Sequence, residues 1–306
     1  MHDLVIIGAG PAGLTAAIYA ARKKLNTLVL AKDVGGQAAL SWEVENYLGY
    51  NLISGAELVM KFREHVEKFG VDFKEGTEAT SLKPVDSPAK TDYSFEVSAG
   101  DEMFQAKTVI VASGKTPRRL NVPGEKEFAG KGIAYCATCD APLFQGKDVA
   151  VVGGGNAALD AAFQLTKIAN RIYLINTDPG LAGDEVTREK VKKSDKVEIL
   201  NNTKTVGIKG EKFVSAIIVK GNEEREIPVQ GIFVEIGSVP AVEFLRGLVE
   251  LNESNEIKVS NRNETSVPGI FAAGDCTNVL EKQIIIAAGE GAKAALSAYS
   301  YLVRRK

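Results

Sequence analysis

The chain has 306 residues, 45% of them hydrophobic and 25% charged, a composition typical of a soluble globular protein with room for two domains. The formal net charge of -2 provides no basic surface for a run of phosphates, and no apolar run has the length of a membrane span, so we expect neither a nucleic-acid nor a membrane partner. The start of the chain does not resemble a signal peptide, and three cysteines in a chain of this size indicate a reducing compartment, so a cytoplasmic location is expected.

The first predicted element is a strand that runs into a glycine-rich turn, in "LVIIGAGPAGLTAAIYAARK". The turn carries G-x-G-x-x-G at Gly8, Gly10 and Gly13, a helix of small residues follows it, and "NTLVLA" provides a second strand. In this context the first glycine makes the turn, the second lets the backbone approach a pyrophosphate, and the third packs helix against strand. Because a helix N-terminus offers N–H groups to phosphate charge, the sequence predicts a dinucleotide site here.

A pair of cysteines, Cys136 and Cys139, lies in "CATCD". Their spacing permits half of a zinc site, a structural disulfide or a redox dithiol. Zinc would need two more ligands, and the third cysteine and both histidines lie far away in the sequence. A disulfide across so short a loop would add little stability. A redox dithiol without a metal is therefore favoured, with Asp140 as either its proton donor or an ordinary turn aspartate.

A second glycine-rich turn follows directly, in "VAVVGGGNAALDAAFQLTK", and "RIYLIN" provides the next strand. It matches G-x-G-x-x-A at Gly153, Gly155 and Ala158, with Asn156 at the start of the helix. A 2′-phosphate would need lysine or arginine just after the next strand, but "NTDPGLAGDE" contains neither. Asn176 or Asp178 could instead bind a free 2′-hydroxyl, which favours NADH over NADPH.

The two halves end alike, in "TVIVASGKTP" and "GIFVEIGSVP", and a return segment, "GIFAAGDCT", completes the first half. The predicted fold is α/β, with two nested Rossmann-like dinucleotide-binding domains, the second inserted in the first. The FAD-binding domain comprises residues 1–114 and 242–306, and an NAD(P)-binding-like domain with the dithiol comprises residues 115–241. Gly274 and Asp275 lie at a strand end, where the carboxylate can accept a hydrogen bond from a sugar hydroxyl of the flavin cofactor.

The chain resembles the low-molecular-weight thioredoxin reductases along nearly its whole length. The resemblance is carried by "GAGPAG", "GGQ", "EVEN", "VPG", "CATCD", the second glycine-rich turn, "GIFAAGD" and "KQI". The segments "GKDVAVVGGGNAALDAA" and "KQIIIAAGEGAKAAL" are most similar to the C-terminal part of the flavoprotein subunit of alkyl hydroperoxide reductase. That relative has an additional thioredoxin-fold region, so we expect this dithiol to serve a separate thioredoxin- or glutaredoxin-like protein.

The resemblance implies the pyridine nucleotide-disulfide oxidoreductase fold, a homodimer and roles for the site residues. Cys139 would face the flavin, Cys136 would exchange with the partner's disulfide, and Asp140 would be the acid–base group. The cofactor-binding residues that it implies, besides the glycines of the two turns, are Pro11, Ala12, Gly36, Gln37, Asn46, Lys282, Gln283 and Ile284.

Two other functions stay open. A ferredoxin-driven thioredoxin reductase, or a flavin dithiol oxidase that passes electrons to oxygen, would keep the flavin and dithiol beside a vestigial nicotinamide site. The lack of a basic residue that could bind a 2′-phosphate favours that reading, and the intact second glycine-rich turn argues against it. A non-catalytic nucleotide-binding redox sensor is the third reading, and the intact cysteine pair argues against it.

Overall fold

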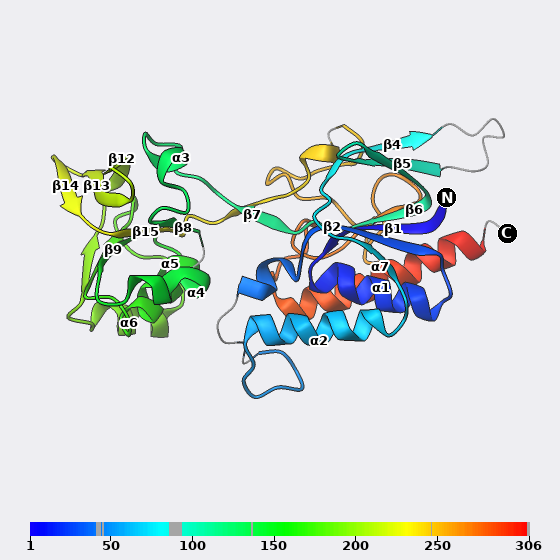
Figure 1. The fold of residues 1–306 in the computed structure, drawn as a ribbon, viewed down its shortest axis with the longest axis horizontal. Helices are drawn as coiled ribbons and strands as arrows, with labels where there is room; N and C mark the ends of the chain where they lie inside the picture. Colours follow the sequence, from blue (N-terminus) through cyan, green and yellow to red (C-terminus); the bar gives the residue numbers. More distant parts are fainter. Residues whose placement is uncertain (41–43, 45, 86–93, 136, 246, 305–306) are drawn as a thin grey trace. The chain divides into compact units, whose positions relative to one another are not determined.

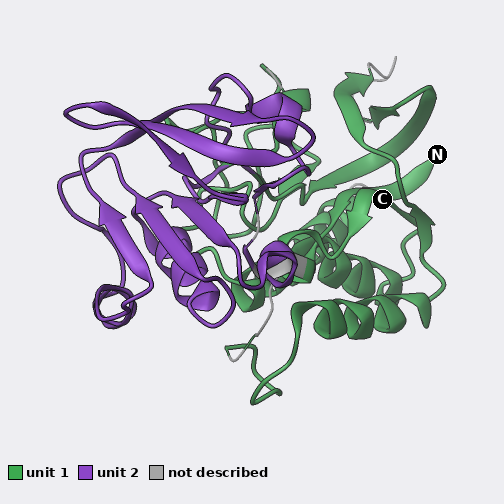
Figure 2. Cartoon of the chain, turned by 60° about the vertical axis from the view of Figure 1, so that its left-hand side comes forward, with its two compact units in different colours: residues 1–116, 239–306 green, residues 117–238 purple. Residues whose placement is uncertain are grey.

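The chain forms two compact units in the computed structural model (Figures 1 and 2). The structure describes residues 1–40, 44, 46–85, 94–135, 137–245 and 247–304, with only the backbone at positions 40, 138 and 139. Unit 1 comprises residues 1–116 and 239–306, and unit 2 comprises residues 117–238. The chain thus leaves unit 1 after Thr116 and returns after Ser238, where the sequence predicts crossings after Gly114 and Ala241.

Unit 1 combines a mixed sheet with helices. Its elements before the first crossing are β1 (His2–Ala9), α1 (Pro11–Arg22), β2 (Thr27–Val34), the 3-10 helix η1 (Gly36–Leu40), α2 (Gly55–Glu67), β3 (Asp72–Lys74), β4 (Ala79–Val85), β5 (Ser94–Ala99), β6 (Glu102–Val111) and β7 (Lys115–Pro117). Those of the return are β16 (Ser238–Pro240), the 3-10 helix η3 (Glu243–Leu245), β17 (Ile270–Ala272) and α7 (Ile284–Val303). The linking strands β7 and β16 pair with each other.

The sheet of unit 1 has the order β3-β2-β1-β6-β5-β4, with β17 also on β6. β3, β2, β1, β6 and β17 are parallel, whereas β4 and β5 form an antiparallel extension. The early part of β6 pairs with β5 and its end pairs with β17, so the return segment continues the parallel sheet. This is the Rossmann-like arrangement that the first half of the sequence predicts.

Alternate residues of the central strand face two different cores, as the two-residue period of a strand requires. In β1, Leu4 and Ile6 pack with the small residues of α1 and α7, while Val5 and Ile7 pack with β4, β5 and the segment after residue 241. All four side chains are at most 4% exposed. Both faces of β1 are therefore covered, which explains why the strand is a continuous apolar run.

Unit 2 repeats the design on a smaller scale. Its elements are α3 (Glu125–Phe128), β8 (Ile133–Ala134), α4 (Ala137–Asp140), the 3-10 helix η2 (Ala141–Phe144), β9 (Asp148–Val152), α5 (Asn156–Leu165), β10 (Arg171–Ile175), α6 (Glu185–Lys192), β11 (Val197–Leu200), β12 (Lys204–Gly210), β13 (Val214–Lys220), β14 (Glu224–Pro228) and β15 (Gly231–Val234). A five-stranded parallel sheet has the order β11-β10-β9-β15-β8, and β12-β13-β14 form an antiparallel sheet.

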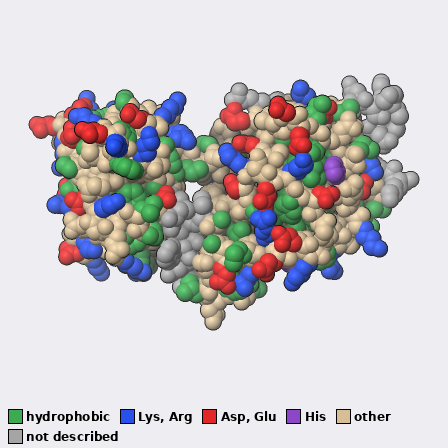
Figure 3. All heavy atoms as spheres, in the orientation of Figure 1, with side chains coloured by type: hydrophobic (Ala, Val, Ile, Leu, Met, Phe, Trp, Pro, Cys, Tyr) green, Lys and Arg blue, Asp and Glu red, His purple; other side chains and the backbone are tan. Residues whose placement is uncertain are grey.

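Charged side chains of both signs are interspersed over each unit on the face that Figure 3 shows. No helix in the described part of the chain is long and apolar enough to cross a membrane. The mixed surface agrees with the near-neutral net charge and provides no single-sign patch on this face.

Helices α1 and α7 of unit 1 are far apart in the sequence, and their backbones approach each other closely at one point. A Cβ atom built on Gly291 of α7 would collide with the carbonyl oxygen of Ala12 in α1, and Gly291 is buried. Gly289, two residues earlier on the same helix, is exposed, and a Cβ built on it would have no atom within 4 Å. The glycine at 291 therefore sets the distance between the two helices.

We predict that Gly291→Ala lowers the free energy of unfolding of unit 1 by roughly 1–3 kcal/mol, because the helices must separate. Gly289→Ala is the matched control and is expected to be neutral or to stabilise by up to about 1 kcal/mol, since alanine is the better helix former. Urea unfolding followed by circular dichroism measures both, and equal effects of the two substitutions would contradict the packing described here.

Candidate functional site

The first glycine-rich turn has the geometry that the sequence predicts for a dinucleotide site. Gly8 has a φ of +105°, and a Cβ there would collide with the carbonyl oxygen of Ala112. A Cβ on Gly13 would collide with the carbonyl oxygen of Gly8. Gly10 is the N-cap of α1 with Pro11 after it, and no side chain caps the helix there. The first N–H groups of α1 are thus left to a ligand of negative charge.

A second pair of glycines lies against this turn. Gly35 donates its backbone N–H to the carbonyl oxygen of Ala9 over 2.7 Å, and a Cβ on Gly36 would lie 3.6 Å from the Cα of Gly10. Gln37 next to it donates from Nε2 to the carbonyl oxygen of Lys115 over 3.3 Å. These residues form a cradle of bare backbone that fits the pyrophosphate of a dinucleotide.

The structure brings together two residues that only the family resemblance connects. Asn46 Nδ2 donates to Gln283 Oε1 over 3.1 Å, although the two are 237 positions apart. Gln283 is the extended N-cap of α7, and Ile284 begins the helix and packs against the buried cluster of Val44, Ile53 and Leu58. The amino end of α7 is therefore fixed to the loop after β2.

The return segment reaches the same region. Gly274 has a φ of +77°, and a Cβ there would lie 3.1 Å from Cβ of Ala12, in the first turn of α1. Asp275 follows it and is partly buried, and burial raises the pKa of its carboxyl. Cys276 is fully buried, with its Sγ 3.4 Å from the carbonyl oxygen of Ala273, and burial raises the pKa of its thiol. Cys276 is thus a packed thiol, unsuited to exchange.

An ionic cluster that sequence reasoning missed holds Lys282. Lys282 Nζ lies 2.9 Å from Glu256 and donates to the carbonyl oxygen of Thr277 over 2.6 Å, and Lys115 Nζ lies 3.2 Å from the same carboxylate. The Glu256 side chain is only 14% exposed. Burial by itself would raise the pKa of Glu256, but hydrogen bonds from Lys282, Asn252 and Lys115 lower it to about 2.

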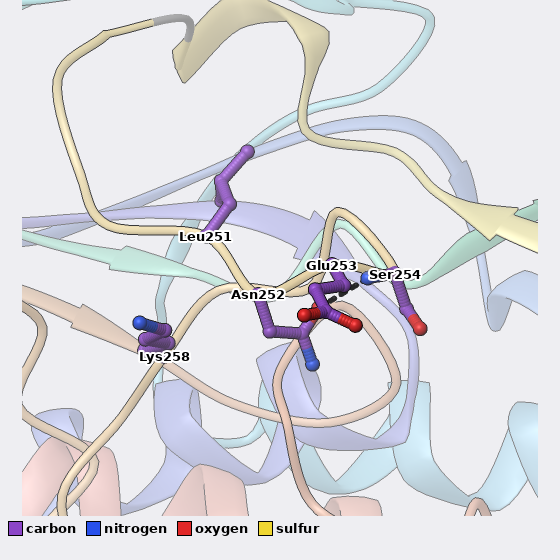
Figure 4. A pocket seen from close by; sticks show the side chains of 5 residues that line it. All are labelled: Leu251, Asn252, Glu253, Ser254 and Lys258. Atoms are coloured by element: carbon purple, nitrogen blue, oxygen red, sulfur yellow. Dashed lines mark hydrogen bonds between the residues drawn. The ribbon is translucent and has the colours of Figure 1, made fainter.

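Figure 4 shows a hollow beside this cluster, lined by Leu251, Asn252, Glu253, Ser254 and Lys258. Asn252 Oδ1 accepts from the backbone N–H of Ser254 over 2.9 Å and of Glu256 over 2.8 Å, and Asn252 Nδ2 donates to Glu256 Oε2. The hollow contains no residue that the sequence places at a cofactor. The turn from Asn252 to Glu256 therefore holds the Glu256 carboxylate in place.

We predict that Glu256→Gln lowers the free energy of unfolding by about 1–3 kcal/mol at pH 7, because two ammonium groups lose their shared carboxylate. Since the folded-state pKa of Glu256 is depressed, its contribution to the free energy of unfolding is present above about pH 4.5, the ordinary pKa of this carboxyl. The contribution is lost as the pH falls toward 2. The difference between wild type and variant in urea unfolding should therefore shrink as the pH falls from about 4.5 toward 2. Glu250→Gln, whose exposed carboxylate lies 3.8 Å from Lys258, is the control and should change little. A pH-independent difference would refute this account.

Unit 2 repeats the glycine geometry. Gly153 has a φ of +143°, and a Cβ there would collide with the carbonyl oxygen of Glu235 and lie 3.0 Å from Cβ of Ala158, which is fully buried. Gly155 is the N-cap of α5 and has no atom within 4 Å of an added Cβ. The open position again lies where a backbone must approach a phosphate.

Two asparagines of unit 2 fix the loop between β10 and α6. Asn156 Oδ1 accepts from the backbone N–H of Asp184 over 2.7 Å. Asn176 is 2% exposed, its Nδ2 donates to the carbonyl oxygens of Asp178 and Gly180, and its Oδ1 accepts from the N–H of Asp178. Asn176 therefore holds the loop itself, whereas Asp178 is exposed.

The same loop presents no cation to a 2′-phosphate. The first basic residue after β10 is Arg188, which donates to the carbonyl oxygen of Leu181 over 3.4 Å and lies 3.7 Å from Glu185. Two nitrogens of the guanidinium thus contact the loop and helix α6, while its buried Nε has no hydrogen-bond partner among the described residues.

Of the cysteine pair, Cys139 belongs to α4, and Cys136 precedes this helix in the sequence. Cys136 is outside the described residues, and Cys139 is described only as backbone within α4. Asp140 ends this helix and is partly buried, and burial raises the pKa of its carboxyl. Among the described residues, no three of the His, Cys, Asp and Glu side chains gather as a metal site.

Known proteins of this architecture show which family the chain represents. The family model described as pyridine nucleotide-disulphide oxidoreductase matches residues 2–291. The chain belongs to this family. A thioredoxin reductase structure from Lactococcus lactis superposes with a TM-score of 0.90 at 35% identity, over 99% of this chain and 100% of that one.

Curated relatives agree with that membership. A Bacillus subtilis "NADH dehydrogenase" is 42% identical over 305 residues, 99% of this chain and 59% of the relative. One alkyl hydroperoxide reductase subunit, that of Xanthomonas campestris pv. phaseoli, is 41% identical over 307 residues, 99% of this chain and 57% of the relative. The chain therefore spans less than two thirds of the length of these family members.

Proposed function

We propose that this chain is a flavin-dependent disulfide reductase. It passes electrons from a nicotinamide, NADH in preference to NADPH, through FAD and the dithiol of Cys136 and Cys139 to a thioredoxin- or glutaredoxin-like protein. The observation that carries the proposal is the occurrence of two dinucleotide turns in one chain, with a cysteine pair on the second unit. By family resemblance we also propose a homodimer in the cytoplasm.

Unit 1 has the groups to hold FAD. The bare backbone at Gly10 and Gly36 would accommodate the pyrophosphate, and the carboxylate of Asp275 would accept a hydrogen bond from a sugar hydroxyl. Asn46 and Gln283 orient the amino end of α7, whose positive end stabilises negative charge beside it. Bound FAD would take a hydride from the nicotinamide and supply two electrons to a disulfide.

The dithiol of unit 2 carries the exchange. The Cys136 thiolate attacks the partner's disulfide, which forms a mixed disulfide and releases one partner thiolate. Cys139 then attacks the mixed disulfide, which forms the Cys136–Cys139 disulfide and releases the second partner thiolate. The two released thiolates take up two protons, and Asp140, with its raised pKa, can deliver one of them.

The preference for NADH or NADPH directly tests the role that we propose for the β10–α6 loop. We predict that NADH reduces the flavin with roughly ten- to a hundredfold higher kcat/KM than NADPH, because the 2′-phosphate gains no charge-assisted hydrogen bond there. Steady-state and anaerobic stopped-flow assays with both donors measure the ratio. Equal or better use of NADPH would contradict the proposal, and failure of both donors would favour the ferredoxin-driven reductase or the dithiol oxidase.

Single cysteine substitutions test the division of labour in the dithiol. Cys136→Ser should leave a Cys139 thiolate beside the oxidised flavin and give a long-wavelength absorbance band. Cys139→Ser should lack the band and trap the partner through Cys136 as a mixed disulfide. Both variants should keep flavin reduction by NADH but lose partner turnover. A band in Cys139→Ser would reverse the two roles, and wild-type turnover in either variant would remove the dithiol from the mechanism.

A further inference from the structure

A carboxyl that no sequence motif indicates lies between the second dinucleotide turn and the dithiol helix. Glu235 directly follows β15, where its backbone N–H donates to the carbonyl oxygen of Val152 over 2.8 Å. Its own carbonyl oxygen occupies the space that a Cβ on Gly153 would need. The backbone of Glu235 is therefore fixed against the turn.

The side chain of Glu235 reaches the amino end of α4. Its Oε1 accepts a hydrogen bond from the backbone N–H of Ala137 over 3.2 Å. Ala137 is the residue after Cys136 and lies two positions before Cys139, and its own side chain is 4% exposed. The carboxyl thus binds the peptide group that joins Cys136 to the helix.

The surroundings of Glu235 disfavour its ionised form. Burial raises the pKa of Glu235, the hydrogen bond from the N–H of Ala137 lowers it, and the negative charge of Asp160 raises it; together they bring the pKa to about 7. The charged side chains on the two neighbouring helices are Asp140 of α4 and Asp160 of α5, and both are acidic. Burial raises the pKa of Asp160 in turn, and the negative charge of Asp184 raises it as well. Among the described residues, none forms an ion pair with Glu235 that would neutralise it.

We propose that Glu235 is a positioning residue that sets the acidity of the dithiol, an inference that rests on the disulfide reductase function proposed above. A carboxylate at the Cys136–Ala137 peptide and a thiolate on the adjoining cysteine repel each other, so each disfavours ionisation of the other. Glu235 thereby restrains thiolate formation once it has lost its proton.

Such coupling has a consequence for proton uptake. Two-electron reduction of the disulfide leaves two sulfurs that need two protons to become thiols. Asp140 follows Cys139 in the sequence, and Glu235 binds the peptide after Cys136, so unit 2 provides one carboxyl for each end of α4. Glu235 takes up a proton from the solvent when a thiolate forms on the adjoining cysteine and returns that proton to the solvent when the disulfide is restored.

The pH dependence of thiol alkylation tests the proposal. The purified flavoprotein is reduced anaerobically, treated with iodoacetamide from about pH 6 to pH 9, and analysed by mass spectrometry at Cys136 and Cys139. Glu235→Gln keeps an oxygen for the N–H of Ala137 but removes the charge. We expect its alkylation rate to equal that of wild type near pH 6 and to exceed it roughly two- to tenfold near pH 8.

Matched variants separate charge from structure. Glu223→Gln, an exposed carboxyl of the same unit, should follow the wild-type profile. Identical profiles for Glu235→Gln and wild type would overturn the proposal, and so would a change in Glu235→Ala that Glu235→Gln does not share. If Glu235→Gln fails to fold, Asp160→Asn, a substitution at an exposed position, takes its place. This variant should move the inflection of the wild-type profile of alkylation rate against pH to lower pH. An inflection at the wild-type pH would overturn the proposal.

Turnover of a thioredoxin disulfide, measured in parallel, keeps the two proposals distinguishable. Wild-type turnover with an unchanged Glu235→Gln alkylation profile would refute the role of Glu235 and leave the reductase function standing. A shifted alkylation profile in a protein that turns over no disulfide would support the coupling and refute the proposed partner.

Discussion

Both units depend on backbone segments that approach each other more closely than any side chain permits. At Gly8 and Gly13 in unit 1, and at Gly153 in unit 2, an added Cβ would collide with a carbonyl oxygen. These contacts bring a parallel strand, a turn and the start of a helix to one point, and they leave the middle positions open at Gly10 and Gly155. The rest of each unit is arranged around the anion-binding end of that helix.

The repeated turn is also the part of the molecule that the sequence predicts best. Glycine spacing is a local pattern, and its steric reason acts over a few residues, so the first and third positions can be assigned before the fold is known. Asn46 and Gln283 were predicted only by resemblance, because a contact across 237 positions has no local signal. Asn176 shows a different limit. A sequence can place an amide at a strand end but cannot tell whether it faces a ligand or, as here, its own loop.

The charged groups that sequence reasoning missed have a common cause. Glu256 lies in an ordinary turn, and its partner Lys115 is 141 positions away, so no local pattern connects the two residues. Glu235 belongs to the strand-end segment "GIFVEIG", which predicts only a strand followed by a turn. Both carboxyls acquire unusual pKa values from long-range packing, in opposite directions. Hydrogen bonds from two ammonium groups outweigh the burial of Glu256 and lower its pKa, whereas burial, and then the charge of Asp160, raise the pKa of Glu235.

The proposed function requires the dithiol to exchange electrons with the flavin of the same protein. Anaerobic titration with NADH, followed by flavin absorbance, tests it most directly, because flavin and disulfide each accept two electrons. The account predicts that full reduction consumes about two equivalents of NADH per flavin in the wild type, and about one in a variant that lacks both Cys136 and Cys139. Consumption of about one equivalent by the wild type, with its cysteines oxidised beforehand, would contradict it.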